Sequence, residues 1–437
     1  MTATQSSSDN SKKTIIILGA SYAGISTAHY ILKHVVPKFP TPSSYQVVLV
    51  SPSEHAMCRP ACPRALISNN FFDQDRLFVS VAEQFSHYPS SSFQFLHGAA
   101  IGLDEQSRTV SVQLAKAGNS DGLSAGKKVL GFHTLVIATG ASTPSPLHGL
   151  NASDRSTLQS HWSSFRKALP NTKTIVITGG GPSGVETAGE LGEYLNGRQS
   201  GWFLSAPPIP KVKITLVCAG PQILPALRPG LASKAENMLA HVGVTVLKNT
   251  RVVSVSQSSP SIKTGLDDSI DVTSPTRVKL NNNTVLEVDL YIPATGTQAN
   301  TSFIPAHLLA NNGRVNANPQ TFRLENTVER IYSIGDCSAA FTRPSIHNIL
   351  SAIPILCSNI QRDLLIAENG GDASASHIKD QLFQEDMREM QLVPIGRSGG
   401  VGAAMGWALP GWLVWLIKGR DYWVWTTGRL WSGRQWA

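Results

Sequence analysis

The segment from Thr174 to Glu193 constrains this chain more than any other, because it combines a strand, a glycine turn and a helix at one fixed spacing. Residues 175–177 are a β-branched run, typical of a strand buried on both faces of a parallel sheet. Gly179, Gly181 and Gly184 follow as G-x-G-x-x-G. Apolar residues then recur at helical spacing: Val185, Ala188, Leu191 and Leu195. The segment therefore predicts a dinucleotide site.

Each glycine of this motif has its own physical task. Gly179 permits the tight turn, Gly181 lets the backbone approach the phosphates, and Gly184 lets the helix pack close to the strand. The pyrophosphate is expected at the helix N-terminus, where free N–H groups and the helix dipole favour an anion. Glu186 lies in the first turns of the same helix.

A second unit of the same kind stands near the N-terminus. Residues 14–18 are a buried strand, and the apolar helix that follows begins after a glycine turn. The turn has serine at the position of the second glycine, which narrows the approach to a pyrophosphate. Its candidate binding residues are Gly19, Ala20, Ser21, Tyr22, Ala23 and Gly24.

Each unit is followed by a strand ending in Ala-Thr-Gly, at residues 135–141 and again at 290–297, which indicates an internal duplication. Ala138 and Gly140 are candidate binding residues in the first copy. We therefore predict an α/β fold with two Rossmann-like dinucleotide-binding domains, the first interrupted by the second, plus a small C-terminal domain. The expected boundaries are 1–145 and 291–365 for the interrupted domain, 146–290 for the inserted one, and 366–437 for the C-terminal domain.

The strand ends that should meet the two adenosine riboses lack the usual acid. The first strand ends at Ser51, with Glu54 as a stand-in three residues later. The second ends at Cys218, and Arg228 is near enough in sequence to help a 2′-phosphate. The choice between NADH and NADPH stays open on these residues.

The segment from Cys58 to Arg64 should run past the first nucleotide. Cys58 and Cys62 form C-x-x-x-C, a spacing that suits either a redox dithiol or two buried thiols, and we favour buried thiols. Arg64 could bind a pyrophosphate through its guanidinium fork, or lie on the surface.

Asp336 follows the short strand 330–334 and Gly335. A carboxylate at that strand end can accept hydrogen bonds from the hydroxyls of a bound cofactor at the mouth of the first unit. The alternative is a cap on the following helix, and the two roles are compatible. We expect the ligand role.

Composition describes a globular protein, with 41% hydrophobic and 15% charged residues among 437. The net charge of +8 is spread without a dense basic run, so it favours anionic cofactors over specific nucleic-acid binding. Five cysteines without zinc spacing favour a reducing compartment, and we expect a cytoplasmic protein without a metal site. Residues 1–13 lack the features of a secretory signal, and no run of about 18 apolar residues predicts a membrane span.

The C-terminal segment is rich in tryptophan, with seven of the nine tryptophans between Trp407 and Trp436. Tryptophan with interspersed Lys and Arg suits the headgroup region of a bilayer, so peripheral membrane contact is one interpretation. An element packed over a cofactor or against a second copy in a homodimer is the other.

With these elements placed, the chain resembles the two-dinucleotide-domain flavoproteins. That family includes apoptosis-inducing factor and its ferroptosis-suppressor relatives, type II NADH:quinone reductases and disulfide reductases, and the fungal apoptosis-inducing-factor-like branch is most similar. The resemblance rests on these segments: Gly19–Gly24, Pro60–Arg64, both Ala-Thr-Gly strands, Gly179–Glu186, Ile334–Asp336 and Lys418–Tyr422.

The resemblance implies that the first unit binds FAD and the second binds NADH or NADPH. It makes Arg64, Ala100 and Asp336 contacts of FAD and places Glu186 near the nicotinamide. The expected activity is hydride transfer from NAD(P)H through FAD to a quinone-like small molecule, and no side chain is nominated as catalytic because the cofactor carries the chemistry. The disulfide-reductase C-x-x-x-x-C is absent, and the family's Gln-containing helix is replaced here by residues 345–351.

Two other functions follow from the same observations. One is an FAD-dependent oxidoreductase specific to a fungal secondary-metabolite pathway, and the other is a basic, nucleic-acid-binding protein like apoptosis-inducing factor. Relatives of this kind also suggest a peripheral position on a mitochondrial or lipid-droplet membrane.

Overall fold

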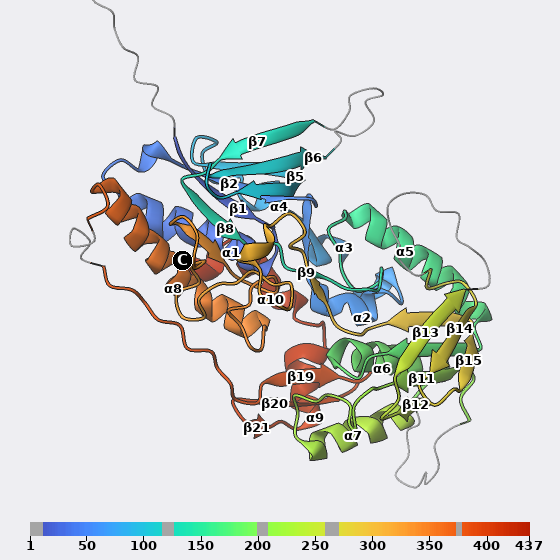
Figure 1. Cartoon of the computed structure of the whole chain (residues 1–437). Helices are drawn as coiled ribbons and strands as arrows, with labels where there is room; N and C mark the ends of the chain where they lie inside the picture. The colour runs from blue at the N-terminus through green and yellow to red at the C-terminus, as the bar shows by residue number, and fades with distance from the viewer. Residues whose placement is uncertain (1–11, 116–125, 199–208, 258–270, 373–377) are drawn as a thin grey trace, which may run out of the picture.

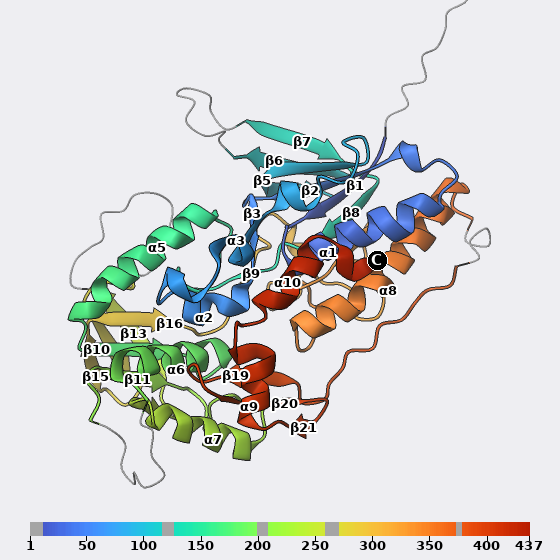
Figure 2. The ribbon, with the colours of Figure 1, turned by 180° about the vertical axis from the view of Figure 1, so that it is seen from behind.

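The computed structural model describes residues 12–115, 126–198, 209–257, 271–372 and 378–437 (Figure 1). Two α/β units lie side by side, and the C-terminal segment runs across both of them (Figures 1 and 2). Most of residues 1–13, which were considered above for a secretory signal, lie outside the described residues.

The first unit is built on a seven-stranded sheet whose central strands are parallel. β1 (Lys13–Leu18) lies between two parallel neighbours, and its three consecutive isoleucines are completely buried. This burial on both faces is what the β-branched run predicts. The other strands, in sheet order around β1, are β18 (Ile331–Ser333), β8 (Thr134–Ile137), β2 (Tyr45–Ser51), β5 (Phe93–Asp104), β6 (Thr109–Leu114) and β7 (Lys127–Gly131).

Helices α1 (Tyr22–Tyr30) and α8 (Ile346–Glu368) pack against each other beside this sheet (Figures 1 and 2). α8 is long and apolar enough to cross a membrane by length and composition alone. Its side chains Ile353, Leu356 and Ile360 are fully buried in the first core, which is the position of a core helix.

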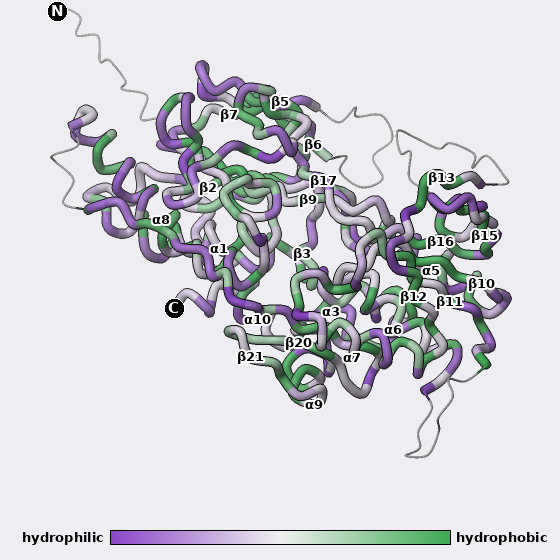
Figure 3. Tube along the Cα trace, turned by 60° about the horizontal axis from the view of Figure 1, so that its bottom comes forward, coloured by the Kyte–Doolittle hydropathy of each residue, from purple (hydrophilic) through white to green (hydrophobic). Residues whose placement is uncertain are grey.

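The second unit holds a four-stranded parallel sheet, in which β10 (Thr174–Thr178) pairs with β11 (Lys213–Val217) and β16 (Leu290–Pro293). β12 (Val244–Leu247) completes the sheet, and α6 (Pro182–Asn196) and α7 (Pro229–Ala240) pack against it. A three-stranded antiparallel sheet follows, made of β13 (Val252–Gln257), β14 (Thr276–Leu280) and β15 (Val285–Val288). Figure 3 shows apolar residues in the strands of the second unit.

The prediction of two Rossmann-like domains, one interrupting the other, is confirmed by this order of elements. The predicted return to the first domain at residue 291 falls inside β16, so the chain leaves the second sheet only after Pro293. The outgoing and returning segments then pair with each other, since β9 (Ala141–Ser142) and β17 (Gln298–Ala299) are antiparallel neighbours.

The C-terminal segment contributes to both cores and forms no separate core cluster among the described residues. It comprises β19 (Gln391–Pro394), β20 (Gly400–Ala404), β21 (Trp407–Ala408), α9 (Gly411–Val414), a π-helical turn (Trp415–Gly419) and α10 (Val424–Trp431). Val393, Val401 and Tyr422 are buried in the second core, while Leu430 and Trp431 are buried in the first. The predicted boundary at 366 also falls within α8. The segment therefore contacts both units.

Candidate functional site

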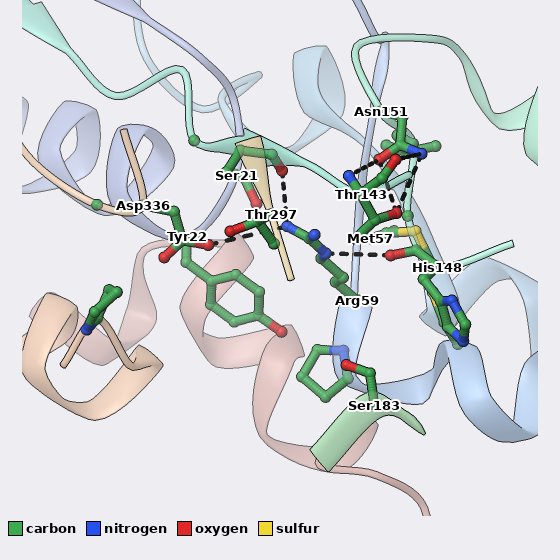
Figure 4. A pocket seen from close by; sticks show the side chains of 18 of the residues that line it. Ser21, Tyr22, Met57, Arg59, Thr143, His148, Asn151, Ser183, Thr297 and Asp336 are labelled. Atoms are coloured by element: carbon green, nitrogen blue, oxygen red, sulfur yellow. Dashed lines mark hydrogen bonds and ion pairs between the residues drawn. The ribbon is translucent and has the colours of Figure 1, made fainter. Parts of the chain in front are cut away.

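The two glycine motifs open onto one cavity of about 720 Å³ between the units (Figure 4). Most of the predicted binding residues line it, although they come from distant parts of the chain. They are Gly19, Ala20, Ser21, Tyr22, Ala23, Ala138, Gly140, Gly179, Gly181, Glu186 and Asp336. Both glycine motifs therefore line one and the same cavity.

The glycines differ in what they do, as the motif predicts. Gly19 and Gly179 have φ values of +107° and +120°, which favour glycine. A Cβ on Gly24 would lie 1.8 Å from the Gly19 carbonyl oxygen, and one on Gly184 would lie 2.0 Å from that of Gly179. Gly24 and Gly184 therefore sit behind the cavity, where they allow the helix to pack on the strand.

The space in front of Gly181 is open, because a Cβ built there meets no described atom within 4 Å. The N-termini of α1 and α6 both face the cavity, at Tyr22 and Pro182. Neither N-cap residue, Ser21 or Gly181, makes a side-chain cap in the described chain, so first-turn N–H groups remain for an anion. These features fit the pyrophosphates of two dinucleotides.

Arg59, rather than the predicted Arg64, is the arginine in the cavity. Its Nη1 donates to the Ala141 carbonyl at 2.9 Å and its Nε to the His148 carbonyl at 3.2 Å. It lies between His148 and Asp336 (Figure 4), with Nη1 3.9 Å from the Asp336 carboxylate. Both arginines fall in the same short segment, and their spacing alone could not distinguish them.

Arg64 is buried behind the cavity with 5% of its surface exposed. Its guanidinium pairs with Glu190 through two hydrogen bonds, so it is not available to a pyrophosphate in the cavity. Ala100 is also outside the cavity lining, because it lies within β5 opposite Val112 of β6.

Asp336 lies where the sequence predicts, just beyond the end of β18, in a turn whose Gly335 has a φ of +89°. Its side chain is 35% exposed, so the carboxylate can accept hydrogen bonds from a ligand. The capping alternative is wrong for α8, because Ser345 caps that helix by accepting from the Asn348 N–H at 3.1 Å.

Glu186 and Lys418 form a buried ion pair in the cavity wall, with Nζ 2.5 Å from Oε1. Lys418 also donates to the Leu392 carbonyl at 3.0 Å. Burial raises the pKa of Glu186 to about 7, against the attraction of Lys418 that lowers it. Lys418 was not predicted as a site residue, since 232 residues separate it from Glu186.

Cys58 and Cys62 are buried free thiols. Burial raises the pKa of Cys58 to about 11 and that of Cys62 to about 12, so both are protonated near neutral pH. The Tyr22 hydroxyl lies 3.5 Å from the Cys58 sulfur. The geometry favours the interpretation as buried thiols over a redox dithiol.

The residues at the two strand ends where the adenosine riboses are expected do not decide between NADH and NADPH. Ser51 lines the cavity, whereas Arg228 is held by an ion pair with Glu389 outside it. Arg228 is therefore already paired and is a poor ligand for a 2′-phosphate.

Two Rossmann-like units that share one cavity, with a carboxylate at the end of β18, define the class of NAD(P)H-dependent flavoprotein reductases. The chain belongs to the pyridine nucleotide-disulphide oxidoreductase family, whose model matches residues 13–354. It is therefore an enzyme that uses FAD and NAD(P)H, as predicted from the resemblance.

The relatives agree with this assignment over nearly the full length. The chain is 54% identical over 427 residues to oxidoreductase phnG of Penicillium herquei, covering 98% of each protein. It is 23% identical over 431 residues to ferroptosis suppressor protein 1 of Mus musculus, covering 95% of each. The solved structure of NDH2 from Plasmodium falciparum in complex with NADH has a TM-score of 0.62 at 15% identity, covering 97% of this chain and 98% of that one.

Proposed function

We propose that this enzyme oxidises NAD(P)H and reduces a quinone-like small molecule. The observation that carries the proposal is that both glycine motifs and the Glu186–Lys418 pair line a single cavity. A relative from Yarrowia lipolytica, 25% identical over 372 residues, is named an external alternative NADH-ubiquinone oxidoreductase, which supports a quinone acceptor. This chain spans 57% of that protein.

The residues of the first unit suit FAD. The N–H groups at the start of α1 and the Arg59 guanidinium would bind the pyrophosphate, and Asp336 would accept hydrogen bonds from the ribityl hydroxyls. When bound, the flavin accepts a hydride from the nicotinamide and passes the electrons to the acceptor.

The residues of the second unit suit NAD(P)H. The N-terminus of α6 and the open space at Gly181 would hold its pyrophosphate. Glu186 and Lys418 lie further along the cavity wall, where they would hold the nicotinamide end and exclude water.

We place the acceptor at the start of α8, where most of the residues that line the cavity are apolar and suit a flat aromatic molecule. Pro344, Ile346 and Ile349 line it at the start of α8, in place of the glutamine-containing helix that the family resemblance suggests. A pathway-specific aromatic metabolite is the second candidate acceptor, because the same apolar wall would receive it.

The test is an anaerobic titration of the FAD-loaded protein with NADH and with NADPH, followed by a panel of acceptors. We expect flavin bleaching by a nicotinamide cofactor, and reoxidation by short-chain ubiquinone or menadione that is faster than by oxygen. Bleaching followed by equally slow reoxidation with all quinones would favour the metabolite acceptor, and no bleaching would refute the proposal.

We further propose that the enzyme contacts a membrane peripherally through an aromatic patch. We use this name for five side chains of the C-terminal segment that are 43–78% exposed: Met405, Trp407, Trp412, Leu416 and Trp425. Figure 3 shows α9, which carries Trp412, as an apolar segment at the edge of the molecule. Trp431, by contrast, is fully buried against Tyr22, so only part of the predicted Trp407–Trp436 segment can serve this contact.

A further inference from the structure

Arg64 lies directly behind the Glu186–Lys418 pair and has all five of its N–H groups engaged. Nε and Nη2 bind the two oxygens of Glu190 at 3.1 and 2.7 Å. Nη1 donates to the carbonyls of Gly419 at 2.8 Å and Arg420 at 3.2 Å, and Nη2 also donates to that of Gly396 at 3.3 Å. The guanidinium binds five acceptor atoms on four residues, and no other side chain offers that number of donors in a fixed plane.

These contacts hold both partners of the ion pair from behind. Glu190 lies one helical turn after Glu186 on α6, on the same face. Gly419 and Arg420 follow Lys418 directly, at the end of the π-helical turn. Arg64 therefore connects the helix that carries the glutamate to the segment that carries the lysine.

The lysine segment needs such support, because its backbone is strained. Tyr422 and Trp423 have φ values of +54° and +68°, in the left-handed region that bulky residues rarely adopt. The Tyr422 hydroxyl donates to Glu190 at 3.0 Å, and the Arg64 guanidinium lies over the Tyr422 ring at 4.8 Å. The strained turn is thus held by the same two side chains, Arg64 and Glu190.

We propose that Arg64 is a positioning residue, which aligns Lys418 with Glu186 at the cavity through Glu190 and the carbonyls of Gly419 and Arg420. The proposal rests on the proposed function, since the pair is taken to hold the nicotinamide end of NAD(P)H. It assigns to Arg64 a role behind the site in place of the direct cofactor contact that the family resemblance implies.

The variant Arg64→Lys tests this role, because lysine keeps the charge beside Glu190 but cannot reach the carbonyls on both sides. Arg323→Lys is the matched control: Arg323 makes the same two-bond pair with Asp363, at 2.6 and 2.8 Å, outside the cavity lining. Two measurements are made on each protein. One is hydrogen–deuterium exchange of residues 415–423 in the apoprotein, and the other is the anaerobic rate of flavin reduction by NAD(P)H in the loaded enzyme.

For Arg64→Lys we expect faster exchange across 415–423 and a reduction rate at least about ten-fold lower, since a misplacement of ~1 Å can cost ~100-fold. The apparent Kd for NAD(P)H should change less than the reduction rate, because the pyrophosphate site is untouched. Arg323→Lys should show neither effect. Wild-type exchange and wild-type reduction in Arg64→Lys would overturn the proposal.

If Arg64→Lys does not fold, the neutral pair Arg64→Gln with Glu190→Gln replaces it, since no buried charge is then left unpaired. The same slow reduction supports positioning, and recovery of the wild-type rate overturns it. If wild-type protein is not reduced by either nicotinamide cofactor, the proposed function fails, while the exchange measurement still decides whether Arg64 holds the lysine segment.

Discussion

Glu186 is the residue whose titration should be most visible, because burial places its pKa near 7. Its folded-state pKa lies above the ordinary value of 4.5, so the folded protein holds this proton more tightly than the unfolded chain. The stability that Glu186 contributes is therefore complete below pH 4.5 and is lost as the pH rises through 7.

The variant Glu186→Gln should remove this pH dependence. Between pH 5 and pH 8 the free energy of unfolding of the wild type should fall relative to that of the variant, by about 3 kcal/mol for a fully buried carboxyl. Urea unfolding of both apoproteins across this range measures the difference. Curves that run parallel would show that the carboxyl titrates near its ordinary value.

Gly181 allows a second prediction at the residue scale. The variant Gly181→Ala should fold normally, because its methyl group enters open space in the protein itself. The same methyl group should obstruct the NAD(P)H pyrophosphate and raise the Kd for NAD(P)H by about ten-fold, or 1.4 kcal/mol. FAD content should be unchanged.

Gly131→Ala is the control for this variant, because its Cβ would also meet no described atom within 4 Å and it does not line the cavity. Isothermal titration with NADH and NADPH measures both variants. Equal affinities for Gly181→Ala and wild type would place the pyrophosphate elsewhere in the cavity.

At the scale of elements, the C-terminal end of the chain is bound to α1 and to the π-helix Ile31–Val35 that follows it. Three side chains there bind the last carbonyls: His29 Nε2 contacts that of Trp431 at 2.8 Å, Lys33 that of Gly433 at 2.9 Å, and His34 that of Trp436 at 2.6 Å. Because α1 begins at the cavity, the fastening also fixes Tyr22, whose ring contacts Trp431.

His29 makes this fastening sensitive to acid. Burial, aided by repulsion from His87 and Lys33, lowers the pKa of His29 to about 4, although the hydrogen bond to the Trp431 carbonyl raises it. The folded-state pKa lies below the ordinary value of 6.5, so the stability that neutral His29 contributes is present above pH 6.5 and is lost as the pH falls through 4.

Between pH 6.5 and pH 4, we expect the free energy of unfolding of His29→Gln to fall by about 3 kcal/mol less than that of the wild type. Thermal or urea unfolding at half-unit pH steps measures it. His241→Gln, at an exposed histidine just after α7, is the control and should follow the wild-type curve. A wild-type slope in His29→Gln would show that other groups cause the acid sensitivity.

On the scale of the whole molecule, the aromatic patch exposes large apolar side chains that a partner surface could bury. Three exposed tryptophans in one segment offer several kcal/mol of burial, since full burial of a large apolar side chain contributes about 1.5–3 kcal/mol. A bilayer interface suits tryptophan and the neighbouring Arg420, whose guanidinium lies over the Trp425 ring at 5.9 Å.

Trp407, Trp412 and Trp425 are replaced together by serine. This triple variant should bind vesicles that contain phosphatidylserine with a partition coefficient at least about ten-fold lower than that of the wild type. Reduction of a water-soluble quinone should be unchanged, because none of the three lines the cavity. Tyr194→Ser with Val253→Ser, at exposed apolar residues of the second unit, is the control.

Vesicle flotation and sedimentation velocity are measured together for these proteins. Unchanged flotation of the triple variant would show that the aromatic patch does not bind the membrane. A wild-type dimer that the triple variant converts to a monomer would assign the patch to a second copy of the chain.

The sequence by itself determined the two nucleotide units, their nesting and the glycines at their turns. A strand, a glycine turn and a helix are local in sequence, so their spacing is enough to identify them. It also determined the position of Asp336 at the edge of the first sheet, because a residue that directly follows a parallel strand lies at the carboxyl edge of that sheet.

Only the tertiary structure decided which side chains share the cavity. Arg59 and Arg64 are five residues apart with similar neighbours, and the choice between them depends on Glu190, which lies more than 100 residues away. Lys418 meets Glu186 only because the C-terminal segment crosses both units, and Trp407 and Trp431 differ in exposure for the same reason. Such contacts depend on which distant elements pack against each other, and a local stretch of sequence does not show its distant partner.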